Sequence, residues 1–404
     1  MLKQISKNSF WLFLSRVLTQ LFQLIFIGII ARALGVQTFG SYVLFALILF
    51  IGNIFTTYGT DALLIREISR EGKISASFSA SAWLQILLSF LWLVTLFLCS
   101  VILKFDSQTR ISLLILNLSL IPLSFQSVFN SLLRAFERMD VYSALNVFTI
   151  LIQTLLAFLF IRGSEDLLLL CVLFFSNQTF IAMISYFVCK RVVSEFKSIE
   201  KPIFSEIINI LRTGWRLAIY FPLSAFHQRL NLFVLSFLSG QELTGLFSAP
   251  ARLMDGMKLA HFSVSNGIMP SMAKPSTQEI KSTLQTSLLF LLAWSIIVGI
   301  VIFFFADLLI NLIYGFAYSE SIPTLQIIGF VLIPYTFSVY FSLQLIMAGK
   351  ENRVLRITFL SLLLAVILYV YLIFNFGLIG AAWGTLINEI IFASFLLIGN
   401  RAIK

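Results

Sequence analysis

The stretch ARALGVQTFGSYVLF, residues 31–45, separates two long apolar runs near the N-terminus. Gly35 and Gly40 stand five residues apart in it, and Tyr42 follows two residues after the second glycine. Apolar runs of about 20 residues have the length of a membrane-spanning helix. The stretch therefore predicts a tight connection between two such helices.

The whole chain is as apolar as its N-terminus. Of its 404 residues, 59% are hydrophobic and 11% charged, and the mean hydropathy is +0.98. Soluble domains carry roughly 25% charged residues. Apolar runs of spanning length recur throughout, whereas the short alternating segments of a membrane β-barrel do not. These features predict an all-α, polytopic membrane protein.

We expect twelve spans in two groups of six. Their residues are 10–33, 40–62, 80–103, 111–133, 141–162, 166–189, 213–239, 243–270, 284–306, 323–347, 355–375 and 378–400. The longest connecting segment, 190–212, lies at mid-chain. The expected domains are thus an N-terminal six-helix lobe (1–189), a cytoplasmic linker (190–212) and a C-terminal six-helix lobe (213–404).

The net charge of +10 reflects orientation. With the N-terminus in the cytoplasm, 19 of the 28 lysines and arginines fall in inner segments, and the outer segments hold Arg32, Lys104, Arg110 and Arg162. Cytoplasmic loops of membrane proteins carry such a basic excess. Both termini are therefore expected in the cytoplasm, and nucleic acid is not expected as a partner.

The glycine spacing of residues 31–45 recurs in the second half of the chain. Gly240 and Gly245 are again five apart, with Phe247 two residues later, at an offset of 205. A second pair of segments, Gly59 to Arg66 and GIMPSMAK (267–274), places a basic residue seven after a glycine in each half. Two six-helix repeats with the same orientation predict a pseudo-axis along the membrane normal and a central cavity, which is a transporter architecture.

Ionisable residues inside spans are candidates for function because their burial in lipid is costly. In the first span, Arg16, Gln20 and Gln23 follow the i, i+4, i+7 pattern of one helix face. We expect this face to line the protein interior or a water-filled cavity. The alternative is a local ion pair between Arg16 and Asp61.

The predicted hairpin around Gly240 carries the largest charged group. Arg229 and Arg252 lie 11 residues before and 12 residues after that glycine, and Asp255 and Lys258 follow on the second helix. One interpretation is a self-neutralising ladder of Arg252, Asp255 and Lys258 that only holds helices together. The other is a cationic cavity for a polyanion, since the planar guanidinium binds phosphate oxygens bidentately.

Other polar groups are weaker candidates. Asn53 and Gln126 line the cavity or serve as interhelical hydrogen bonds. The in-span acids Asp61, Asp255 and Glu389 are the candidates for ion coupling. Three cysteines and two histidines without ligand spacing predict no metal site. The sequence also lacks a nucleotide-binding P-loop and a sizeable soluble domain, so we expect no catalytic residues and no enzyme.

Several segments together resemble one family along nearly the whole chain. They are ARALGVQTFGSYVLF, YGTDALLIREISREGK, LLRAFERMDVYSALNV, SGQELTGLFSAPARLMD, GIMPSMAK and FGLIGAAWGTLINE. They are similar to the polysaccharide-transporter (Wzx-type flippase) family, whose superfamily also contains MATE exporters and lipid II flippases. The resemblance implies flipping of undecaprenyl-pyrophosphate-linked oligosaccharides across a bacterial inner membrane by alternating access.

For the site, the resemblance implies a cationic cavity, here Arg16, Arg229, Arg252 and Lys258, without a cofactor and with H⁺ or Na⁺ coupling. The expected partners are the lipid-linked oligosaccharide, membrane lipids, a polysaccharide polymerase and a chain-length regulator. Two alternatives remain. A MATE-like exporter of cationic drugs predicts an acidic cavity, which the surplus of in-span cations opposes. A membrane polymerase or ligase of the same pathway is the alternative from another class.

Overall fold

The computed structural model describes residues 2–71, 74, 76–196, 198–201, 203–264 and 278–401. These residues are almost all helical, and none of them forms a β-strand. The all-α prediction is confirmed. The GIMPSMAK segment lies outside the described residues, so the second pair of repeated segments stays a prediction.

The first half of the chain contains seven α-helices in its described part. They are α1 (Leu2–Thr57), α2 (Thr60–Glu71), α3 (Ala76–Ile102), α4 (Ser107–Leu118), α5 (Leu120–Ala135), α6 (Met139–Phe160) and α7 (Leu167–Val192). The second half contains α8 (Phe204–Met257), α10 (Gln278–Ile313), α11 (Ile322–Gly329), α12 (Leu332–Met347) and α13 (Glu351–Arg401). Short 3₁₀ turns precede α7 and α11, at Ser164–Asp166 and Phe316–Ser321.

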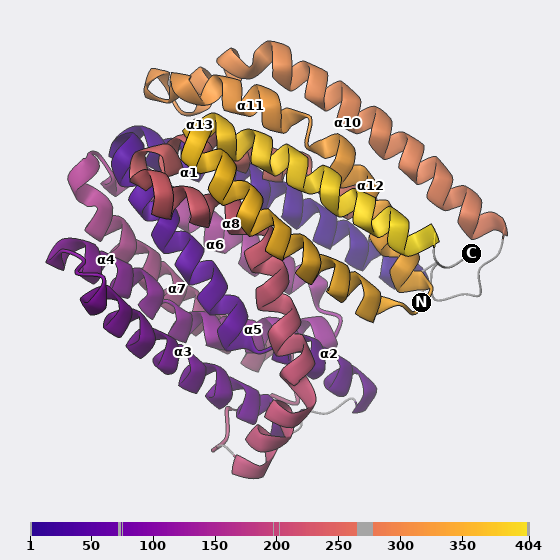
Figure 1. The fold of residues 1–404 in the computed structure, drawn as a ribbon. Helices are drawn as coiled ribbons and strands as arrows, with labels where there is room; N and C mark the ends of the chain where they lie inside the picture. Colours follow the sequence, from indigo (N-terminus) through magenta and orange to yellow (C-terminus); the bar gives the residue numbers. More distant parts are fainter. Residues whose placement is uncertain are drawn as a thin grey trace. The chain divides into compact units, whose positions relative to one another are not determined.

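Three of these helices are too long to cross a membrane once. α1, α8 and α13 have 56, 54 and 51 residues, so each would extend well over twice the roughly 30 Å of a bilayer core. Each is interrupted at one glycine with positive φ: Gly35 (73°), Gly240 (82°) and Gly377 (53°). Glycine adopts this backbone without steric cost, and Figure 1 shows α13 folding back on itself at its interruption.

The number of spans is consistent with the count expected from the sequence. Among the described residues, eight helices are long and apolar enough to cross a membrane, and α11 with α12 adds a ninth. Three of the nine (Phe10–Thr57, Phe221–Val264 and Asn352–Asn400) contain a glycine kink. Counting each of these three as a pair of spans is consistent with the twelve predicted.

Two predicted spans are broken, and the linker is partly helical. The expected span 111–133 consists of α4 and α5, separated at Ser119, and 323–347 consists of α11 and α12, bent by 42°. Both breaks lie just before a proline, Pro122 or Pro334, whose ring disrupts the preceding helical turn. Within the expected linker 190–212, α8 already begins at Phe204.

The chain divides into two compact units. Unit 1 comprises Met1–Leu34 and Phe45–Phe226, and unit 2 comprises Gly35–Leu44 and His227–Lys404. The stretch quoted first in the sequence therefore belongs largely to unit 2. The two six-helix lobes with boundaries at 189 and 213 stay a prediction.

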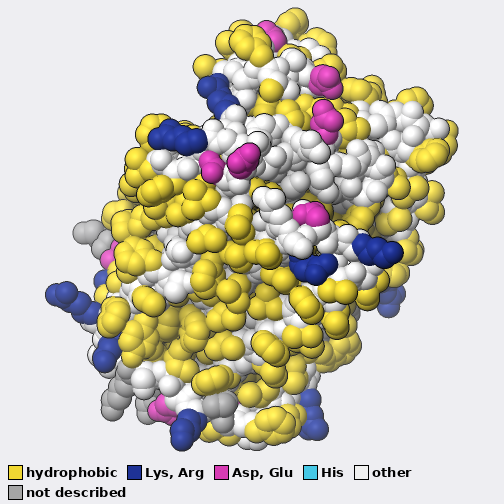
Figure 2. Space-filling model, turned by 90° about the vertical axis from the view of Figure 1, so that its left-hand side faces the viewer, with side chains coloured by type: hydrophobic (Ala, Val, Ile, Leu, Met, Phe, Trp, Pro, Cys, Tyr) yellow, Lys and Arg dark blue, Asp and Glu magenta, His cyan; other side chains and the backbone are white. Residues whose placement is uncertain are grey.

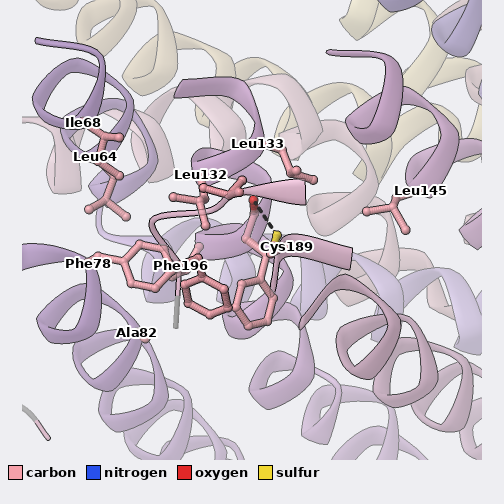
Figure 3. Close-up of a cluster of buried hydrophobic side chains, with 12 residues drawn as sticks. Leu64, Ile68, Phe78, Ala82, Leu132, Leu133, Leu145, Cys189 and Phe196 are labelled. Atoms are coloured by element: carbon pink, nitrogen blue, oxygen red, sulfur yellow. Dashed lines mark hydrogen bonds between the residues drawn. The ribbon is translucent and has the colours of Figure 1, made fainter. Parts of the chain in front are cut away.

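The interior of unit 1 forms where α5 contacts α2, α3 and α7. Phe78, Phe129 and Phe196 meet edge to face, with ring centroids 5.6–5.8 Å apart. The buried thiol of Cys189 faces the carbonyl oxygen of Phe129 at 3.8 Å (Figure 3). This cysteine fills space in an apolar cluster.

Unit 2 builds its interior from neighbouring long helices. α10 contacts α11 and α12, and α12 contacts α13 (Figure 1). Leu345, Val354, Ile357 and Leu396 form an apolar cluster between α12 and α13. On the outside, large side chains such as Phe304 and Phe374 are 75% and 79% exposed. Figure 2 shows hydrophobic side chains over most of one face, as expected for a polytopic membrane protein.

The two glycine motifs meet within unit 2. A Cβ atom added to Gly40 would overlap the carbonyl group of Gln241, and one added to Gly245 would overlap that of Val36. Gln241 follows Gly240 as Val36 follows Gly35, so the two contacts are equivalent under the offset of 205. Such reciprocity is the mark of a two-fold contact, and it supports the two repeats.

Candidate functional site

The kink at Gly240 brings two charged residues of α8 together. The Nη2 atom of Arg229 lies 2.8 Å from the Oδ2 atom of Asp255, and the side chains are 23% and 25% exposed. Arg229 precedes the kink and Asp255 follows it, so the ion pair crosses the hairpin. The ion pair is therefore only half-buried.

Arg252 lies one helical turn before Asp255. Arg229, Asp255 and the phenols of Tyr42 and Tyr314 act on it electrostatically. Within the described part of the chain, Arg252 makes no ion pair and no hydrogen bond. The N–H groups of its guanidinium therefore have no hydrogen-bond acceptor among the described residues.

Lys258 and Glu389 extend the group toward α12 and α13. The Nζ atom of Lys258 lies 4.9 Å from the ring centroid of Tyr335, a cation–π contact. The carboxylate of Glu389 lies within hydrogen-bonding distance of Ser338 and interacts electrostatically with Lys258. We call Arg229, Arg252, Asp255, Lys258 and Glu389 the charged cluster of unit 2; it carries three positive and two negative groups.

The charged cluster differs from the ladder that the sequence offered as an alternative. Asp255 pairs with Arg229 across the hairpin, and not with Arg252 or Lys258 along its own helix. The spacing around Gly240 predicted Arg229 and Arg252 on facing helices, and in the structure the two residues interact electrostatically. Their contact with substrate is a separate question and stays a prediction.

Sequence reasoning missed the hydroxyl and aromatic groups beside this cluster. The Nε2 atom of His261 lies 2.7 Å from the Thr336 Oγ1 atom and 3.3 Å from the Ser295 Oγ atom. The His261 ring also packs on Tyr335, with centroids 5.1 Å apart. The only available signal was a histidine three residues after Lys258.

The polar face of α1 lies in unit 1. Arg16 is exposed, and Gln20 and Gln23 are half-buried and make no hydrogen bond with described residues. No ion pair joins Arg16 to Asp61 among the described residues, so the alternative of a local pair is not formed. A cavity role for Arg16, Gln20 and Gln23 stays a prediction.

The remaining candidates of unit 1 have different surroundings. Asn53 is half-buried and makes no side-chain hydrogen bond with described residues. Gln126 is buried, and its Nε2 atom donates to the backbone oxygen of Gln178 at 2.7 Å and to its Oε1 atom at 3.0 Å. Gln126 thus forms an interhelical hydrogen bond. Asp61 accepts a short hydrogen bond from Ser127.

Side chains of the usual metal-ligating kinds do not gather in the described part of the chain. Among the described residues, no three His, Cys, Asp or Glu side chains gather closely enough to hold a metal ion in the usual way. Two of the cysteines, Cys171 and Cys189, are buried, and Cys99 is exposed.

Comparison with known proteins identifies the family. A family model described as polysaccharide biosynthesis protein matches residues 5–276, about two thirds of the chain. The chain belongs to this family. The match confirms the resemblance drawn from the sequence motifs.

A curated relative of this family member comes from Shigella dysenteriae and is named "Putative O-antigen transporter". It is 22% identical over 407 residues, which cover 98% of this chain and 100% of the relative. The two proteins are therefore similar along their entire length.

Solved structures share the fold. A lipid II flippase, MurJ in an inward closed conformation, matches with a TM-score of 0.78 at 15% identity and covers 98% of this chain and 87% of that one. A MOP superfamily transporter from Pyrococcus furiosus gives 0.69 at 15% identity, covering 99% and 95%. An inward-facing MATE transporter gives 0.71 at 14% identity, covering 95% and 94%. These names are of transporters and flippases, in agreement with the prediction of a polytopic membrane protein that is not an enzyme.

Proposed function

We propose that this protein flips a lipid-linked oligosaccharide across the bacterial inner membrane by alternating access. The substrate is a repeat unit of O-antigen, capsule or a related glycan carried on undecaprenyl pyrophosphate, moved from the cytoplasmic to the outer leaflet. Family membership, full-length similarity to a protein named as an O-antigen transporter and the helical membrane fold support this proposal.

The observation that carries the proposal is the unsatisfied donor set of the charged cluster. Arg229 is held by one carboxylate oxygen, and Arg252 by no acceptor among the described residues. A pyrophosphate offers several anionic oxygens, which suit the planar donor forks of two arginines. Cations inside a membrane are costly without a counter-charge, and the anionic head of the substrate supplies it. Lys258 adds a further cation nearby.

The energy for transport comes from an H⁺ or Na⁺ gradient in this proposal, and no cofactor takes part. Asp255 and Glu389 in unit 2 and Asp61 in unit 1 are the acids available for coupling. Both chain termini lie in the cytoplasm, in keeping with the basic residues of the inner segments. A polysaccharide polymerase and a chain-length regulator receive the product on the outer side.

Complementation of a deletion strain tests the proposal. The deletion is expected to abolish the surface polysaccharide and to leave single lipid-linked repeat units inside. The variants Arg229→Ala and Arg252→Ala, expressed at wild-type level, are expected to restore less than about a tenth of the surface glycan, because each loses more than 1.4 kcal/mol of anion binding. Arg138→Ala is the matched control: Arg138 also pairs with an aspartate, Asp140 at 3.3 Å, in an exposed position.

Other outcomes contradict the proposal. Unchanged surface glycan in the deletion strain, together with sensitivity to cationic drugs, indicates an exporter. Long lipid-linked glycan in the deletion strain indicates a ligase, and single units on the outer surface indicate a polymerase. Full activity of both arginine variants removes the charged cluster from the binding site.

A further inference from the structure

A second polar group lies inside unit 1 and includes Asp61, one of the acids named above as available for coupling. It joins the first turn of α2, where Asp61 lies, to Gln85 in α3 and Ser127 in α5. The Gln85 side chain is fully buried and Asp61 is half-buried. α3 and α5 belong to apolar spans, so an acid packed against them needs compensation.

Asp61 receives little compensation from its neighbours. The Ser127 hydroxyl donates a short hydrogen bond to its Oδ1 atom. No ion pair to Asp61 exists among the described residues. Arg134 acts on it electrostatically, but this arginine is exposed and its guanidinium lies over the Tyr142 ring at 5.8 Å. The negative charge has no direct cationic partner.

Two hydroxyl groups beside Asp61 have backbone oxygens as hydrogen-bond acceptors. Thr60 Oγ1 donates to the Thr57 oxygen at 2.8 Å. Ser131 Oγ lies within hydrogen-bonding distance of both the Asp61 carboxylate and the Ser127 oxygen, the latter at 3.0 Å, and its single proton serves one of the two. A hydroxyl has one proton and two lone pairs. The group is therefore rich in oxygen lone pairs and poor in donors.

Gln85 adds an oxygen without a partner. Its Nε2 atom donates to Thr60 Oγ1 at 2.7 Å and approaches Ser127 Oγ at 3.4 Å. Its Oε1 atom is buried and has no hydrogen-bond partner. Turning the amide over would set this oxygen against Thr60 Oγ1, whose proton is already given to Thr57. A buried unpaired carbonyl oxygen is costly.

We infer that Asp61, Gln85 and Ser127 bind Na⁺, a hard cation whose single charge one carboxylate balances. A carboxylate, an unpaired amide oxygen and hydroxyl lone pairs are the oxygen ligands that hard cations take. The cation satisfies the Gln85 oxygen and neutralises Asp61 at once. Binding of the cation does not depend on the transported substrate. The use of this cation as the coupling ion rests on the proposed function.

Binding of ²²Na⁺ to the purified full-length protein in detergent tests this inference. Saturable binding is expected, displaced by excess unlabelled Na⁺ and not by choline. Asp61→Asn and Gln85→Leu are each expected to weaken binding at least about tenfold. Gln178→Leu is the matched control, because it removes another buried amide of the same unit that is already paired with Gln126. Na⁺ is also expected to raise the unfolding temperature of the wild type by a few degrees and that of Asp61→Asn by none.

Two results would overturn the inference. One is the absence of saturable ²²Na⁺ binding, or unchanged binding in folded Asp61→Asn. The other is stabilisation of the wild type by lowered pH with no effect of Na⁺, which would mean that Asp61 holds a proton. Neither result depends on the glycan assay, so failure of this site and failure of the flippase proposal are distinguishable.

Discussion

Gly40 and Gly245 pack backbone to backbone in unit 2, although 204 residues separate them in the sequence. Each glycine lies against the carbonyl group of the residue that follows the kink glycine of the other repeat, Gln241 or Val36. Neither position has room for a side chain. This contact joins the two repeated motifs and gives their spacing a structural reason.

Alanine at either glycine is expected to destabilise the protein. The added methyl group would meet backbone atoms, which cannot rotate away, so we expect Gly40→Ala and Gly245→Ala each to cost at least about 2 kcal/mol. Thermal unfolding in detergent measures the effect. Gly163→Ala is the control, because nothing lies within 4 Å of a Cβ atom there and its φ is negative. Wild-type stability of both variants would contradict the close contact.

Gln126 is expected to matter for stability more than for transport. It joins α5 to α7 through Gln178, as polar residues often join helices in membranes. Gln126→Leu is expected to lower the free energy of unfolding by about 1 kcal/mol and to leave the surface glycan of a complemented strain unchanged. Loss of transport in a stable, well-expressed variant would instead indicate that Gln126 lines the cavity.

The first turn of α4 is expected to weaken in acid. The hydroxyl and the backbone N–H of Thr109 donate to the Asp106 carboxylate, the latter at 2.9 Å, and hold the pKa of Asp106 below its ordinary value. A carboxyl group whose pKa is lower in the folded state stabilises above its unfolded pKa of about 3.9, and the contribution is lost as pH falls below that value.

Hydrogen exchange of the amides of residues 107–110 measures this effect. Protection is expected to decrease below about pH 4 in the wild type, whereas Asp106→Asn keeps the cap and loses the pH dependence. Asp106→Ala is expected to lose the cap at every pH, at a cost of about 1 kcal/mol. Equal protection in the wild type and Asp106→Ala at neutral pH would show that the cap contributes nothing.

The sequence predicted the helices because composition and run length determine them in a membrane. It also located two of the three glycine kinks, since Gly35 and Gly240 lie between apolar runs. Gln85 went unnoticed because its importance lies in one unpaired oxygen, which depends on the rotamers of residues on three helices. The Arg229–Asp255 pair was missed for the same reason: spacing gives depth along a helix, and the kink geometry decides which charges meet.

Removal of the Asp255 charge is expected to strengthen the affinity of the charged cluster for anions. Asp255 is surrounded by Arg229, Arg252 and Lys258, so Asp255→Asn leaves these three cations with Glu389 as the remaining acid of the charged cluster. We expect the free energy of unfolding of the variant to fall by about 1–3 kcal/mol, after allowance for the partial exposure of the pair, and its unfolding temperature to fall with it. Added inorganic pyrophosphate is expected to raise that temperature more in Asp255→Asn than in the wild type, since a ligand stabilises the state that binds it.

Arg138 and Asp140 provide the control pair, and Asp140→Asn is expected to show no pyrophosphate effect beyond that of the wild type. An equal response of Asp255→Asn and the wild type would mean that Asp255 does not compete with anions for the arginines.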